Sequence, residues 1–103
     1  MASLFVLDLT YTADVAEVEV EVDRHMGGHR EFLRGQYDAG RFLASGRKEP
    51  RTGGVILATG DRATIEKIIE SDPFQVHGLV TYTVTEFLPT TTGPELAALR
   101  HEL

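Results

Sequence analysis

Apolar and polar positions alternate with a period of two in some segments of the chain and recur every three or four residues in others. The segments Ser3–Tyr11 and Leu79–Phe87 have the alternation, and the branched and aromatic residues, that are typical of strands. Two more strands are expected in RFLASGRKEP and, after a turn, in RTGGVILATG. The first of these is expected to break near Ser45-Gly46, because a glycine within a strand often marks a bulge.

The segment from Asp14 to Ala39 carries two conflicting patterns. Alternation of valine with glutamate around Val20 favours a strand, whereas apolar residues three or four apart favour a helix. We interpret the segment as a helix because it is long and ends at Gly40. Two consecutive glycines, Gly27-Gly28, predict a kink or a late start, since each costs about 1 kcal/mol relative to alanine.

Two further helical segments are expected. DRATIEKIIES predicts a short helix with Asp61 as its N-cap and three isoleucines on its apolar side. LPTTTGPELAALRHEL predicts a polar linker followed by a terminal helical turn or two. We therefore expect a domain over residues 1–89 and a tail over 90–103.

The order of the main elements is βαββαβ, which predicts an α+β, ferredoxin-like fold: an antiparallel sheet with two helices on one face. The other face would be left uncovered, with Leu, Val and Tyr side chains on it. Apolar patches of this size usually meet a partner. We expect a homodimer through this open sheet face, and the sequence leaves a higher oligomer open.

Composition excludes several classes of protein. Ten basic and sixteen acidic residues give a net charge of −6, which disfavours nucleic-acid binding. The absence of cysteine excludes disulfides and thiolate chemistry and suits a reducing cytoplasm. The start of the chain is a poor signal peptide, and no apolar run is long enough for a membrane helix.

Two residues stand out as candidates for chemistry. At 100° per residue, His29 lies on the inward stripe of its helix, close to the direction of Val18 and Val22. It is either a core histidine bonded to a carbonyl group or a general acid–base at a pocket. Asp72, in ESDPFQVHG, either caps backbone amides of a turn or orients an imidazole. Phe74 is either a core residue or a platform for a ligand.

The segment after the second strand carries groups that could hold a ligand. Ser45 could donate to a substrate oxygen, or could only satisfy a bulge at Gly46. The basic side chains of Arg47, Lys48 and Arg51 are either a solvated loop or a clamp for a carboxylate. The glycines form no phosphate loop and the histidine spacing matches no metal motif, so we expect neither metal nor cofactor.

Three segments, HREFLRGQYDAGRFLASG, PRTGGVILA and DPFQVHGLVTYTVTEF, together resemble the YCII-related (YciI-like) domain family. The resemblance spans about Asp23 to Pro89 and implies a dimeric α/β barrel with a paired His and Asp at a pocket. The pair would be His29 and Asp72. Ser45-Gly46 and Arg51 also match the pattern, whereas Arg47 replaces the proline of many members.

The resemblance implies two functions from different classes. One is a small cofactor-independent enzyme, an isomerase or a lyase of the dehydrochlorinase type, acting on a small anionic carbonyl compound or lactone. The other is a non-catalytic binding or accessory protein that uses the same pocket. For the enzyme, we expect His29 to move a proton, with Asp72 within hydrogen-bond reach to orient it, and Ser45 and Phe74 at the edge of the pocket.

Overall fold

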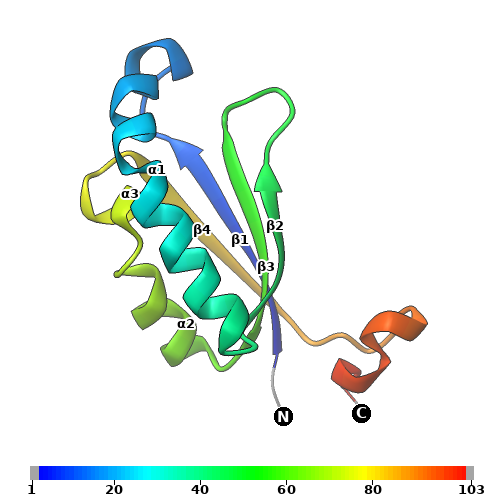
Figure 1. The fold of residues 1–103 in the computed structure, drawn as a ribbon. Coiled ribbons are helices and arrows are strands. Elements are labelled where there is room, and N and C mark those ends of the chain that lie inside the picture. The colour runs from blue at the N-terminus through cyan, green and yellow to red at the C-terminus, as the bar shows by residue number, and fades with distance from the viewer. Residues whose placement is uncertain (1–2, 102–103) are drawn as a thin grey trace.

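The computed structural model describes residues 3–101 and contains one four-stranded antiparallel sheet with helices on one face (Figure 1). The strand order across the sheet is β2-β3-β1-β4. In chain order the elements are β1 (Ser3–Tyr11), α1 (Val15–Asp38), β2 (Phe42–Arg47), β3 (Gly53–Gly60), α2 (Arg62–Ile69), α3 (Pro73–Val76), β4 (Val80–Phe87) and the 3₁₀ helix η1 (Pro94–Leu99). The predicted α+β, ferredoxin-like arrangement is confirmed.

The core lies between the sheet and the helices. Side chains from one face of β1, such as Phe5 and Leu7, are fully buried against Val22 of α1 and Ile65 of α2. The predicted N-cap of α2 is present, because a side-chain oxygen of Asp61 accepts a hydrogen bond from the backbone of Thr64 at 3.0 Å. Both helices therefore bury their apolar stripes on the same face of the sheet.

Helix α1 runs without interruption from Val15 to Asp38, so the late start predicted at Gly27-Gly28 is wrong. Its first half is held by Val18 and Val22, which lie one turn apart and are buried, while Val20 is 65% exposed. Tertiary burial of one valine face therefore outweighs both the strand-like alternation and the two glycines. None of the helices in the described part of the chain is long and apolar enough to cross a lipid bilayer.

Strand β2 does not break at Ser45-Gly46 as predicted. Ser45 and Gly46 pair with Ile56 and Val55 of β3, and the strand continues to Arg47. The irregularity comes earlier, where the register shifts between Phe42 and Ala44. The extra residue of this bulge is therefore upstream of the glycine.

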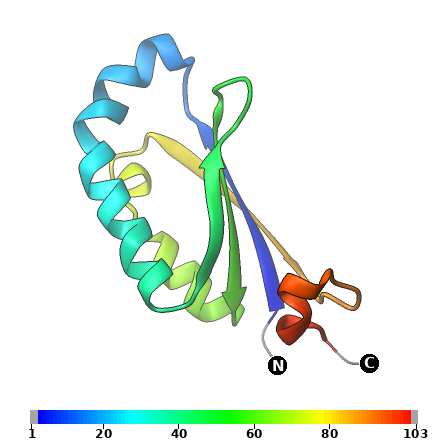
Figure 2. The ribbon, with the colours of Figure 1, turned by 45° about the vertical axis from the view of Figure 1, so that its right-hand side comes forward.

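The face of the sheet opposite the helices is open over most of its area (Figure 2). By the alternation of β1 and β3, it carries Val6, Val55 and Leu57. The expected tyrosine is absent from this face among the described residues, because Tyr82 packs on the helix side. After β4 the tail carries η1 and lies at the end of the sheet where β1 begins, away from the helices (Figures 1 and 2).

Candidate active site between helix α1 and the sheet

The residue that organises the candidate site is Asp72, at the N-terminus of the short helix α3. One of its oxygens, Oδ1, accepts a hydrogen bond from the backbone N–H of Phe74 at 3.0 Å, and Pro73 occupies the first helical position. The predicted capping role is therefore present. The side chain is also fully buried, at 0% exposure. A buried carboxylate is stable only when its oxygens have hydrogen-bond partners, so the remaining partners matter.

Two side chains supply these partners. Nδ1 of His29 lies 2.8 Å from Oδ1 of Asp72, so the contact expected between these distant positions is present. The hydroxyl of Tyr82, on β4, donates to Oδ2 at 2.5 Å. Burial, together with the neighbouring Asp72 carboxylate, raises the pKa of Tyr82 far above its ordinary value, so the hydroxyl keeps its proton and remains the donor.

His29 is held in one orientation by its surroundings. Its side chain is 12% exposed, and its ring stacks on Phe74 with centroids 4.0 Å apart and planes 6° apart. An ionised Asp72 can only accept hydrogen bonds, so Nδ1 of His29 carries a proton. In a neutral imidazole, the lone pair is then on Nε2, which has no partner among the described residues. This is the arrangement of a general base oriented by a carboxylate.

The close approach of α3 to α1 brings the pair together. A side chain at Gly28 would place its Cβ 3.2 Å from Cγ of Pro73, whereas a side chain at Gly27 would meet nothing within 4 Å. Gly28 therefore lets the proline ring lie against the backbone of α1. His29 and Asp72, each the chain neighbour of one of these residues, are brought within hydrogen-bond distance as a result.

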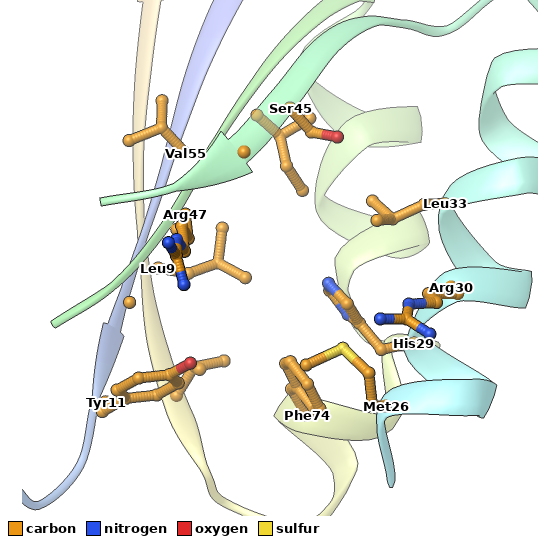
Figure 3. Close-up of a pocket in the computed structure, with 15 residues that line it drawn as sticks. Leu9, Tyr11, Met26, His29, Arg30, Leu33, Ser45, Arg47, Val55 and Phe74 are labelled. Carbon is orange, nitrogen blue, oxygen red and sulfur yellow. The ribbon is translucent and has the colours of Figure 1, made fainter. Parts of the chain in front are cut away.

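A pocket of about 190 Å³ opens beside His29, between α1 and the sheet (Figure 3). His29, Ser45, Gly46, Arg47 and Phe74 all line it. Its remaining lining residues, most of them apolar or glycine, are Leu9, Tyr11, Met26, Arg30, Leu33, Gly53, Gly54, Val55, Ile56 and Val80.

Two of the sequence-predicted site residues, Asp72 and Arg51, do not line this pocket, and Asp72 is connected to it through its bond to His29. Arg51 is in the connection between β2 and β3, where it borders a separate hollow with Thr10 and Pro50. Its predicted role in holding a ligand at His29 therefore has no support in the geometry of the pocket.

The bulge in β2 explains why Ser45 and Arg47 face the pocket. Phe42 and Ser45 pair with Ala58 and Ile56, two buried residues on the helix side of β3. Without the register shift, strict alternation would put position 45 on the opposite face from Phe42. The hydroxyl of Ser45 also contacts the hydroxyl of Tyr37 at 2.7 Å, which ties β2 to α1.

Two polar residues of the site were missed in the sequence. The alternation of β4 puts Tyr82 on the same face as Val80 and Val84, which indicates that it points toward the helices. No local pattern indicates its hydrogen bond to Asp72. Arg30 directly follows His29 and lines the pocket with Arg47. Neither guanidinium has an ion-pair partner within residues 3–101, so the pocket rim carries positive charge in a chain of net charge −6.

The geometry can be compared with known proteins. The family model described as YCII-related domain matches residues 4–88. Among curated proteins, none has a sequence that matches the chain. A similar solved structure is 5-chloro-2-hydroxyhydroquinone dehydrochlorinase (TftG) from Burkholderia phenoliruptrix AC1100, in complex with 2,5-dihydroxybenzoquinone. Its TM-score is 0.67 at 16% identity, covering 89% of this chain and 97% of that chain. At this identity the likeness concerns the fold.

Proposed function

The chain belongs to the YCII-related domain family, and we propose that it is a small cofactor-independent enzyme that uses His29 as a general acid–base on a small anionic carbonyl compound or lactone. One observation carries the proposal: the imidazole of His29 is bonded to the buried Asp72 and lies at the edge of a pocket. A histidine so placed can take a proton from a carbon next to a carbonyl group.

The chemistry would begin with transfer of that proton to Nε2 of His29, which leaves the electron pair in an enolate. Return of the proton to another carbon gives an isomer. Expulsion of chloride from the adjacent carbon, with formation of a double bond, gives the lyase-type outcome that the name of TftG describes. Arg30 and Arg47, at the rim of the pocket, would attract an anionic substrate, and Ser45 would donate to one of its oxygens.

The test is proton exchange at carbon. The chain is incubated in D₂O with a panel of small carbonyl acids and lactones, and NMR follows deuterium incorporation next to the carbonyl group and any new product. We expect exchange or conversion of at least one compound, and a loss of about 10²–10⁴-fold in His29→Gln.

A matched control is His25→Gln, one turn earlier on α1. His25 does not line the pocket, and its ring stacks on His77 with centroids 3.8 Å apart. The His25→Gln substitution should leave the rate of exchange or conversion unchanged. A compound that binds beside His29 without exchange or conversion would instead support the non-catalytic binding function. Equal rates in His29→Gln and the unaltered chain would refute the acid–base role.

We also propose that two copies associate through the open sheet face. Val55 and Phe87 on this face are 38% and 40% exposed, and Val6 and Leu57 lie between them in the register. Covering these side chains would remove apolar surface from water.

A further inference from the structure

A half-buried tyrosine, Tyr82, has a hydroxyl that the acid–base chemistry does not use. Tyr82 projects from β4 toward the helices, opposite Leu9 of β1, which itself lines the pocket. Its hydroxyl donates to Oδ2 of Asp72 at 2.5 Å, on the far side of the carboxylate from His29. Tyr82 is not among the residues that line the pocket, so a ligand there would not need to touch it.

We propose that Tyr82 is a positioning residue, which fixes the carboxylate of Asp72 against His29 and sets how strongly that carboxylate stabilises the imidazolium. The role rests on the proposed acid–base function of His29. It goes beyond that function because it assigns control of the proton affinity of His29 to a group that touches neither the pocket nor the imidazole.

The geometry of Asp72 gives the reason. The carboxylate has no contact with solvent, so its charge is distributed over three donors: the backbone of Phe74, the imidazole of His29 and the hydroxyl of Tyr82. Hydrogen bonds to a charged group are about twice as strong as neutral ones, and donors that share one carboxylate compete for its negative charge. A strong bond from Tyr82 therefore weakens the hold of the carboxylate on the imidazolium.

Orientation follows from the same contacts. Oδ1 is shared between Phe74 and His29, and Oδ2 has Tyr82 alone. Without the hydroxyl of Tyr82, a buried oxygen would lose its partner, and the imidazolium of His29 would carry a larger share of the stabilisation of the carboxylate. The raised pKa of Tyr82 is consistent with a hydroxyl that donates throughout the neutral range.

The experiment measures the titration of His29 by NMR in the ligand-free full chain, so it does not depend on finding a substrate. Tyr82→Phe removes the donor, and we expect the titration midpoint of His29 to rise by about half a pH unit or more, because the carboxylate then favours the imidazolium more strongly. Replacing Tyr82 by 3-fluorotyrosine keeps the hydroxyl but makes it a stronger donor, so the midpoint should fall.

The control is Tyr11→Phe, which removes a phenol that lines the same pocket and has no side-chain hydrogen bond to Asp72 or His29. Tyr11→Phe should not move the titration midpoint of His29. The other charged groups lining the pocket, Arg30 and Arg47, are the same in all variants.

Opposite shifts in the phenylalanine and fluorotyrosine variants support the role of Tyr82. Shifts of the His29 midpoint with the same sign in both variants, or no shift, overturn this role. If Tyr82→Phe does not fold, the fluorotyrosine variant decides, because a midpoint that does not fall in that variant overturns the role. The outcome is separable from the proposed function. Absence of turnover with the expected shifts would refute the enzyme and keep the network, whereas turnover without shifts would refute only the role of Tyr82.

Discussion

The two adjacent glycines of α1 offer a direct measure of how closely α3 must approach the helix. Replacing glycine by alanine inside a helix stabilises it by about 1 kcal/mol, through conformational entropy and backbone burial. At Gly27 the new methyl group meets nothing within 4 Å, so Gly27→Ala should gain the full amount. For a chain of this size, the expected rise in melting temperature is about 4–8 °C.

At Gly28 the same gain is opposed by packing. The new Cβ would lie 3.2 Å from Cγ of Pro73, closer than ordinary van der Waals contact, so α3 must move outward by a few tenths of an ångström. Overpacking typically costs about 1–3 kcal/mol, so the net effect of Gly28→Ala should be about 0–2 kcal/mol of destabilisation. Because Asp72 precedes Pro73, the 2.8 Å bond to His29 should also lengthen.

Urea denaturation followed by circular dichroism gives the free energy of unfolding of both variants, and NMR titration reports whether His29 has changed its environment. The expected pattern is a stabilised Gly27→Ala with an unchanged His29, and a Gly28→Ala that gains nothing and shifts the titration of His29. Equal stabilisation of the two variants, with His29 unaffected in both, would show that the approach of α3 is not limited at Gly28.

Two further predictions concern the open sheet face. Leu57→Arg should convert a dimer of about twice 11.4 kDa into a monomer in light scattering, since the centre of an interface tolerates charge poorly. The control Val20→Arg, on the exposed side of α1, should leave the dimer intact. A monomeric unaltered chain at micromolar concentration would refute the proposed dimer. On the same face, a hydrogen bond from Lys48 at 2.6 Å holds the pKa of Asp8 below its ordinary value, so the pair should stabilise the fold above about pH 4 and lose this contribution as the pH falls through the lowered pKa. Lys48→Met should therefore reduce the difference in unfolding free energy between pH 7 and pH 3, and an unchanged difference would show that the pair is fully screened by solvent.

Local patterns predicted most of the secondary structure because they depend on neighbours in the chain. The alternation in β1 matches the observed strand, and the predicted helix around His29 differs from α1 by about one residue at each end. The N-cap at Asp61 is also a local hydrogen bond. Where two local signals conflicted, as around Val20, only the burial of Val22 against the sheet decided between them.

The candidate site was predictable only in part. The inward direction of His29 follows from helical periodicity, and the family resemblance paired it with Asp72; the contact itself is present. The exclusion of Arg51 and the inclusion of Arg30 could not be predicted in the same way. A loop position has no periodic pattern that fixes its direction, and the long side chain of Arg30 reaches the pocket only because of where α1 crosses the sheet.

By itself, the sequence determined the main elements, their order and the imidazole that faces inward, because periodicity and capping act over three or four residues, whereas the short helix α3 was predicted as a turn. Tertiary structure alone decided that a one-residue shift after Phe42 turns Ser45 toward the helices, that Gly28 admits Pro73, and that Tyr82 bonds to Asp72. Each of these depends on the register or spacing between elements that are distant in the chain. Registers are set by packing the whole core at once, since shifting a strand by one residue reverses every side chain on it.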